Sequence, residues 1–466
     1  MRKQQVQGRR VEWVVRFLGV LFALGAVSAP GLAAQDVEER FPGVSLGITY
    51  DGRQAATLAI QPFSGRMGGE NLANRVQNIV GRDLRYSNRF RILDELPESL
   101  SADEVDYGLW DQMRADYLVT GRVEGAGTTA TLVLELHDVV YREVVDRGRF
   151  PLPNPESDDF RMAVHVAADA VVLWATGEPG IAATRIVFSQ RMDDGNQDLW
   201  IVDSDGENRR RLTNHQSISM SPSWSPDGRR VVYLSYRTGL PRIYELNLET
   251  GAEKMVPAPR SGDYLTPTYT PDGETVVFSI VGSGRSGLFS YNIARDCCFA
   301  NITEGAYEDM SPTFSPDGSR MAFSSNRLGI GAPQIYVRPT SGGSSELLSP
   351  FAFDRPGYYT SPEWSPIGNR VAYHGRVERR GVHQILISEL DQRNRIVRVT
   401  TEGVNEDPSW APDGRHLVFV GERSWGRGLF VVDAVTGNVR TLVSGVRANL
   451  PSWSPSFAPR LAEDRQ

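Results

Sequence analysis

The sequence has few of the residues that build reactive or metal-binding sites. Its only two cysteines, Cys297 and Cys298, are neighbours, so no disulfide can join distant parts of the chain. In an exported protein the two could form a local disulfide or stay a thiol pair, and both alternatives remain open. The histidines form no HExxH pair, and no GxSxG elbow occurs; they are dispersed at positions 137, 165, 215, 374, 383 and 416. We therefore expect a protein that is not an enzyme.

Long apolar runs and basic clusters are also scarce. Residues 1–34 have the form of a signal peptide, with a basic flank, an apolar run of 13 residues from Phe17 to Ala29, and small residues up to Ala34. An uncleaved anchor is the alternative, but the run is short for a bilayer. Cleavage after Ala33 or Ala34 removes five basic and one acidic side chain, which takes the net charge from −7 to −11. We therefore expect no nucleic-acid partner and no direct membrane insertion.

Glycine and proline are plentiful, with 45 and 28 residues, and they mark an internal repeat. Six copies of a motif close to SPSWSPDG occur from residue 221 onward, and their second prolines are 45, 45, 50, 46 and 43 residues apart. This is the length of a four-stranded propeller blade. The repeat therefore predicts a mainly β protein with a six-bladed β-propeller of WD40-like (PD40) repeats.

The residues of each motif predict a strand that ends in a tight turn. Proline followed by Asp-Gly suits a type I turn. An aromatic residue precedes that proline by two positions in every copy: Trp224, Tyr269, Phe314, Trp364, Trp410 and Trp453. We expect these six motif aromatics to pack between neighbouring blades, with an aromatic binding cage as the alternative.

The two ends of the repeat region complement each other. Residues 186–213 supply three strands with no motif strand before them, whereas residues 450–455 supply a motif strand with nothing after it. We predict that the last strand completes the first blade, because this pairing removes exposed sheet edges and closes the ring.

The segment before the propeller alternates strands and helices and predicts a small α/β domain. The expected organisation is a signal peptide (1–34), a mobile leader (35–56), the α/β domain (57–176), a linker (177–183), the propeller (184–457) and a tail (458–466). The glycine-rich segment 282–287 has no following helix to hold a phosphate, and we interpret it as a hairpin loop.

Acidic residues gather just before the motif strands, at Asp263, Glu308, Asp309, Asp354, Glu406 and Asp407. Blade symmetry would place them on one face near the central channel. They could bind a cation such as Ca²⁺, receive a basic partner surface, or remain solvated loop charges. We expect no other cofactor.

The order of signal peptide, α/β domain and six SPSWSPDG-type units, including Met220 to Gly228 and Leu450 to Pro455, resembles the TolB family over essentially the whole mature chain. Ile367 in place of the motif aspartate, the long loop 349–360 and the tail 457–466 depart from the pattern. The resemblance implies a monomeric periplasmic scaffold of the Tol-Pal system that supports protein transport, cell division and outer-membrane integrity.

The resemblance also implies two partners. It implies that the lipoprotein Pal binds the propeller face where the motif strands begin, at Met220, Ser221, Asp263, Tyr264, Thr266, Met310 and Ser311, and blade symmetry extends the face to Thr360, Glu406 and Asp407. It implies that TolA binds the leader, through Gln35, Asp36, Val37, Glu38, Glu39 and Phe41. Two alternatives stay open: a periplasmic hydrolase or lactonase that uses channel carboxylates and a metal, and a periplasmic propeller with no Tol connection.

Overall fold

A computed structural model describes residues 55–458 except 95, 97–103, 283–284, 304–305, 353–356, 377–380 and 392–394. All of these residues belong to one compact unit. The predicted signal peptide, most of the leader, the end of the tail and Asp354 lie outside the described residues. Within the described part, no helix is both long and apolar enough to cross a membrane.

The first domain is a sheet with helices against it, which confirms the predicted α/β class. Its strands are β1 (Ala56–Ile60), β2 (Ser64–Arg66), β3 (Phe90–Ile92), β4 (Tyr117–Glu124), β5 (Thr131–Asp138) and β6 (Glu143–Pro151). The sheet has the order β3-β1-β4-β5-β6, with β2 also paired to β4. The strand pairs β1–β3 and β1–β4 are parallel, and β4–β5 and β5–β6 are antiparallel.

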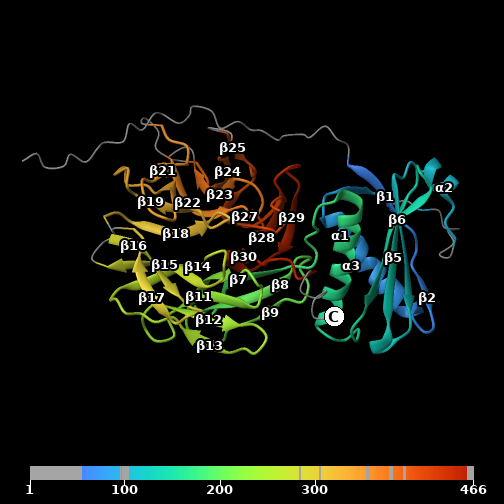
Figure 1. Cartoon of the computed structure of the whole chain (residues 1–466), viewed down its shortest axis with the longest axis horizontal. Coiled ribbons are helices and arrows are strands. Elements are labelled where there is room, and N and C mark those ends of the chain that lie inside the picture. Colours follow the sequence, from blue (N-terminus) through green and yellow to red (C-terminus); the bar gives the residue numbers. More distant parts are fainter. Residues whose placement is uncertain are drawn as a thin grey trace, which may run out of the picture. The chain divides into compact units, whose positions relative to one another are not determined.

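Two long helices, α1 (Glu70–Tyr86) and α3 (Asp159–Thr176), lie side by side against this sheet (Figure 1). On α1, Ala73, Val76, Val80 and Leu84 recur at helical spacing and are buried. The short helix α2 (Tyr107–Gln112) places Trp110 in a second apolar cluster, with Leu118 and Val139. The domain therefore has two apolar clusters, one that includes α1 and α3 and one that includes α2.

The second domain is a propeller of six four-stranded antiparallel sheets, as the repeat predicted. The first three sheets are β10 (Ser219–Trp224), β11 (Arg230–Ser235), β12 (Arg242–Asn247) and β13 (Glu253–Met255); β14 (Asp263–Tyr269), β15 (Thr275–Gly282), β16 (Arg285–Asn292) and β17 (Cys297–Asn301); and β18 (Asp309–Phe314), β19 (Arg320–Ser325), β20 (Gln334–Pro339) and β21 (Glu346–Leu347). The next two are β22 (Tyr358–Trp364), β23 (Arg370–Arg376), β24 (Gln384–Glu389) and β25 (Arg395–Arg398); and β26 (Val404–Trp410), β27 (His416–Arg423), β28 (Gly426–Asp433) and β29 (Val439–Val443).

The sixth sheet joins the two ends of the repeat region, which confirms the predicted closure. It consists of β30 (Arg447–Trp453), β7 (Arg185–Arg191), β8 (Gln197–Asp203) and β9 (Arg210–Arg211), in that order. Strand β30 lies beside β7 (Figure 1), and Trp453 is in register with Ile186. The last strand of the chain therefore completes the sheet that the first propeller strands begin.

Two local features of the propeller were open or predicted from the sequence. Strands β15 and β16 pair as far as Gly282 and Arg285, so the glycine-rich segment is a hairpin connection, as predicted. Cys297 and Cys298 form a disulfide with each other on β17. Of the two alternatives, a local disulfide and a thiol pair, the structure therefore has the disulfide.

Candidate binding face of the propeller

One residue of every motif strand adopts a left-handed backbone conformation. These residues, here called the channel ring, are Ser221, Thr266, Ser311, Ser361, Asp407 and Leu450, with φ between 47° and 54°. Each lies where the pairing with the next strand shifts register, as a β-bulge does. Such φ values cost energy in residues other than glycine, so the surrounding sheet must hold them.

The channel ring surrounds a central pocket of about 210 Å³, to which all six blades contribute. Asp407 links three blades there. Its carboxylate accepts hydrogen bonds from the Ser361 hydroxyl at 3.2 Å and from the Leu450 amide at 3.3 Å. Across the ring, the Thr266 hydroxyl is 2.9 Å from that of Ser279 and accepts from the Ser311 amide at 3.2 Å. Several polar groups of the pocket lining therefore already bind one another, between the prolines that every blade also contributes.

A second carboxyl group, Glu363, also lines the central pocket, at a position where the other motifs have serine or threonine. Burial in the channel wall raises the pKa of Glu363 to about 8, although the Ser409 hydroxyl donates a 3.0 Å hydrogen bond to it. At neutral pH this group is therefore mainly uncharged.

The predicted convergence of six acidic residues occurs only in part. Asp407 lines the central pocket, whereas Asp309 is buried and pairs with Arg327 at 3.0 Å. Asp263 and Glu308 are exposed, and neither lines the central pocket. The reason is position: only Asp407 occupies the ring position of its strand, whereas Asp263, Glu308 and Asp309 lie two or three residues before the ring residue of theirs.

Four residues expected on the Pal face, Ser221, Thr266, Ser311 and Asp407, belong to the channel ring. Met220, Met310 and Thr360 each directly precede a ring residue, and all three are half-buried. Tyr264 differs from the expectation, because its side chain is fully buried and packs against Phe278. Its hydroxyl donates to the Arg260 carbonyl at 2.9 Å, so it supports the blade rather than presenting its ring.

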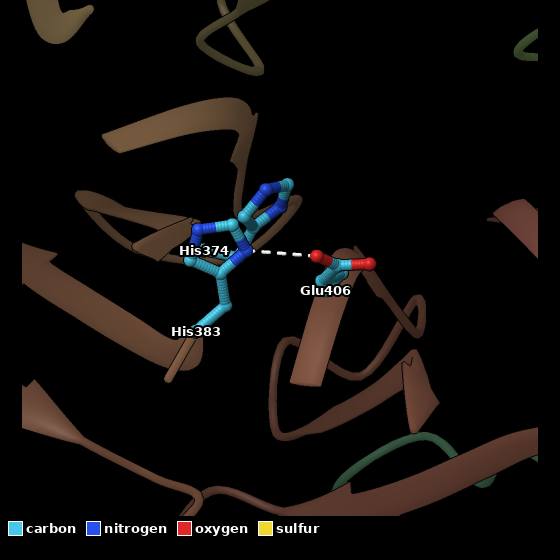
Figure 2. Close-up of side chains that lie close together, drawn as sticks. All are labelled: His374, His383 and Glu406. Carbon is cyan, nitrogen blue, oxygen red and sulfur yellow. Dashed lines mark hydrogen bonds and ion pairs between the residues drawn. The ribbon is translucent and has the colours of Figure 1, made fainter. Parts of the chain in front are cut away.

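Beside the ring lies a cluster that the sequence analysis missed. His374 on β23, His383 just before β24 and Glu406 on β26 approach one another, as Figure 2 shows. His383 Nδ1 and Glu406 Oε1 are 2.7 Å apart, and this hydrogen bond, with the positive charges nearby, lowers the pKa of Glu406 to about 2. The sequence did hold a signal for the two histidines. His374 and His383 flank the connection between two predicted consecutive strands, and a hairpin brings such residues together.

The cluster has three atoms within ligand distance of one another, so it could in principle hold a metal ion. However, the amide of Asp407 lies 3.0 Å from His374 Nδ1, which must therefore accept that hydrogen bond. A neutral ring that accepts at Nδ1 carries its proton on Nε2, which leaves no free lone pair for a metal. Burial lowers the pKa of His374 and favours this neutral form. The observed geometry therefore fits a hydrogen-bonded cluster better than a metal site.

A second group, Asp83, His165 and Asp205, is fully buried where α1 and α3 meet the propeller. His165 Nδ1 is 2.7 Å from Asp83 Oδ2, and the two nearby aspartates raise the pKa of His165 to about 9 in spite of its burial. Arg161 also binds Asp205. Protein cations already balance both carboxylates, so this group supports the fold.

Comparison with known proteins identifies relatives of both domains. The family profile of the TolB amino-terminal domain matches residues 44–145, and that of the TolB beta propeller domain matches residues 174–457. The Tol-Pal system protein TolB of Paramagnetospirillum magneticum is 33% identical over 217 residues, 45% of this chain and 48% of that protein. The protein of the same name from Anaeromyxobacter sp. is 34% identical over 238 residues, 50% of this chain and 52% of that protein.

The chain thus spans about half the length of the curated relatives it matches. A crystal structure of TolB from Acinetobacter baumannii covers 86% of this chain and 97% of its own, with a TM-score of 0.75 and 24% identity. At this identity the likeness supports the fold alone.

Proposed function

The chain belongs to the TolB family, and on that premise we propose that it is a non-catalytic periplasmic scaffold of the Tol-Pal system that binds Pal through the channel ring and the residues around it. The TolB beta propeller profile covers more than half of the chain, and the curated relatives are Tol-Pal system proteins. The observation that carries the proposal is the ring itself. Six blades present polar and half-buried apolar side chains on one face.

Two methionines make this face suitable for a protein partner. Met220 and Met310 stand next to ring residues on different blades, and both keep part of their side chain accessible. Flexible thioether side chains are frequent at protein-binding surfaces, because they adapt to a partner's shape. We propose that these two side chains contact Pal, together with the accessible polar atoms of the channel ring.

The test is to replace Met220 or Met310 with arginine and to measure Pal binding by calorimetry. We expect each substitution to weaken binding at least tenfold, because it places an unpaired charge in the contact. Met255→Arg is the matched control, since Met255 is an exposed methionine on the outer strand β13 and should not affect binding. Unchanged affinity in both Met220→Arg and Met310→Arg would refute the proposed face.

The hydrolase alternative would need a metal or a free catalytic base near the channel. The cluster of His374, His383 and Glu406 is the one arrangement described above that favours it. Its His374 Nδ1 is already engaged by a backbone amide, so the scaffold function has the stronger support.

A further inference from the structure

Neighbouring blades meet at a repeated pair of positions, and each such contact between two blades is here called a joint. One is the motif aromatic, and the other is the residue that begins the second strand of the preceding blade. Strand register makes the following residues equivalent at this second position: Arg185, Arg230, Thr275, Arg320, Arg370 and His416. Four of the six are therefore arginine.

At three joints an arginine of this set lies over the motif aromatic of the next blade. The guanidinium carbon is 5.8 Å from the Tyr269 ring centroid for Arg230, 4.9 Å from that of Trp364 for Arg320, and 5.1 Å from that of Trp410 for Arg370. A fourth, Arg185, lies 5.6 Å over Phe457, which packs edge-on against Trp224. At four of the six joints, the guanidinium group of an arginine therefore packs over an aromatic ring.

Two joints lack this arginine: at one of them His416 holds the position, and the other lies between the sheet of β14–β17 and the sheet of β18–β21. Thr275 stands in the arginine position, and the aromatic is Phe314. Phe314 is the only motif aromatic of the six that is not buried. A pocket of about 580 Å³ opens between the two blades and is lined by both residues. The short side chain of Thr275 leaves the space that an arginine occupies at four of the other five joints.

The chemistry of this pocket suits an arginine side chain. Val277, Ile302 and Met321 give it an apolar wall that could receive the methylene stem. Asp272 and Asp317 stand at its rim, and both are exposed. Hydrogen bonds from Ser315 and Ser319 lower the pKa of Asp317 to about 2, and those from Thr270 and Glu274 lower that of Asp272. The rim therefore carries negative charge at neutral pH.

We propose that this pocket binds an arginine side chain of a partner polypeptide, with the guanidinium over Phe314 and near the two rim carboxylates. Phe314 supplies the aromatic face, and the space left by Thr275 admits the side chain. The planar guanidinium stacks on a ring better than the ammonium of lysine does. The site is formed by the motif turns and not by the channel ring, so it is independent of the proposed Pal contact.

The first experiment measures the binding of N-acetyl-arginine amide to the full mature protein from the backbone amide shifts of Thr275 and Phe314. N-acetyl-citrulline amide has the same shape without the charge. We expect a millimolar dissociation constant for the arginine probe and at least tenfold weaker binding of the citrulline probe. Free arginine, which brings its own carboxylate to the acidic rim, should bind more weakly than the amide. Equal binding of the arginine and citrulline probes would overturn the proposal.

Two variants locate the site. Thr275→Arg should fill the joint from within and reduce binding of the arginine probe at least tenfold, whereas Arg320→Thr should open a second, similar site over Trp364. Phe314→Leu keeps the pocket apolar but removes the ring, and should also weaken binding. Wild-type affinity in folded Thr275→Arg or Phe314→Leu protein would place binding elsewhere and refute the proposal. Pal binding by these variants should be unchanged, which separates this inference from the proposed function.

Discussion

Trp453 donates its indole N–H to the hydroxyl of Thr184 at 2.8 Å, across 269 positions of the chain. The backbone amide of Trp453 also donates a hydrogen bond of 2.9 Å to the hydroxyl of Ser409 in the neighbouring blade. One side chain therefore joins the end of the propeller to its beginning, and its backbone joins the fifth blade to the sixth. The closure of the ring depends on contacts that no local segment could make.

We expect Trp453→Ala to lower the free energy of unfolding by about 3–5 kcal/mol, because it leaves a large cavity and removes the bond to Thr184. Ending the chain at residue 448 should have a larger effect, since most of β30 is then lost. Urea unfolding followed by circular dichroism measures both. Trp425→Ala is the control, because Trp425 is 56% exposed and its loss should cost about 0.5 kcal/mol or less. A truncated protein as stable as the mature chain would contradict closure by β30.

Glu363 gives the propeller a pH dependence. Its pKa is about 8 in the folded protein and 4.5 ordinarily, so the folded state binds more protons between these values. Its contribution is fully present below about pH 4.5 and is lost as the pH rises through 8, by at most about 1.4 kcal/mol per unit. We expect Glu363→Gln to remove this slope in urea unfolding between pH 5 and 8. The exposed Glu402→Gln should keep it. If wild type and Glu363→Gln have parallel pH profiles, Glu363 is ionised and this assignment is wrong.

The role of the leader in TolA binding remains a prediction from the family resemblance, since residues 35–54 lie outside the described part. Removing residues 35–46 should abolish TolA binding and leave the melting temperature of both domains unchanged, because every helix and strand of the described part is kept. A pull-down with TolA and a thermal scan measure the two effects. A control protein with the same residues in scrambled order keeps the length and charge of the leader. TolA binding by the shortened protein would reject the role of the leader.

The repeat motif predicted the propeller because it combines local and global signals. Pro-Asp-Gly fixes a turn, the motif aromatic requires packing, and the spacing sets the size of a blade. Other features gave weaker signals. Strand β6 is mostly exposed and shows no alternation of apolar residues, so no sequence pattern predicted it. His374 and Glu406 meet only because two neighbouring blades pack against each other. The pocket at Phe314 is recognised only by comparison with the joints that an arginine fills.

The histidine cluster beside the channel separates a scaffold from a metal enzyme. Because His374 Nδ1 accepts the Asp407 amide, we expect Zn²⁺ at tenfold excess to leave the melting temperature within about 1 °C of the apo value. Glu406→Gln should lower stability by about 1 kcal/mol at pH 7, since it removes the ion pair with Arg427 and weakens the hydrogen bond with His383. This loss should shrink as the pH falls below 4.5 toward 2, where Glu406 of the wild type becomes protonated. The exposed Glu308→Gln is the matched control and should change neither property. A rise in melting temperature with Zn²⁺ that Glu406→Gln abolishes would mean that His374 turns its ring to bind the ion, and would favour the hydrolase alternative.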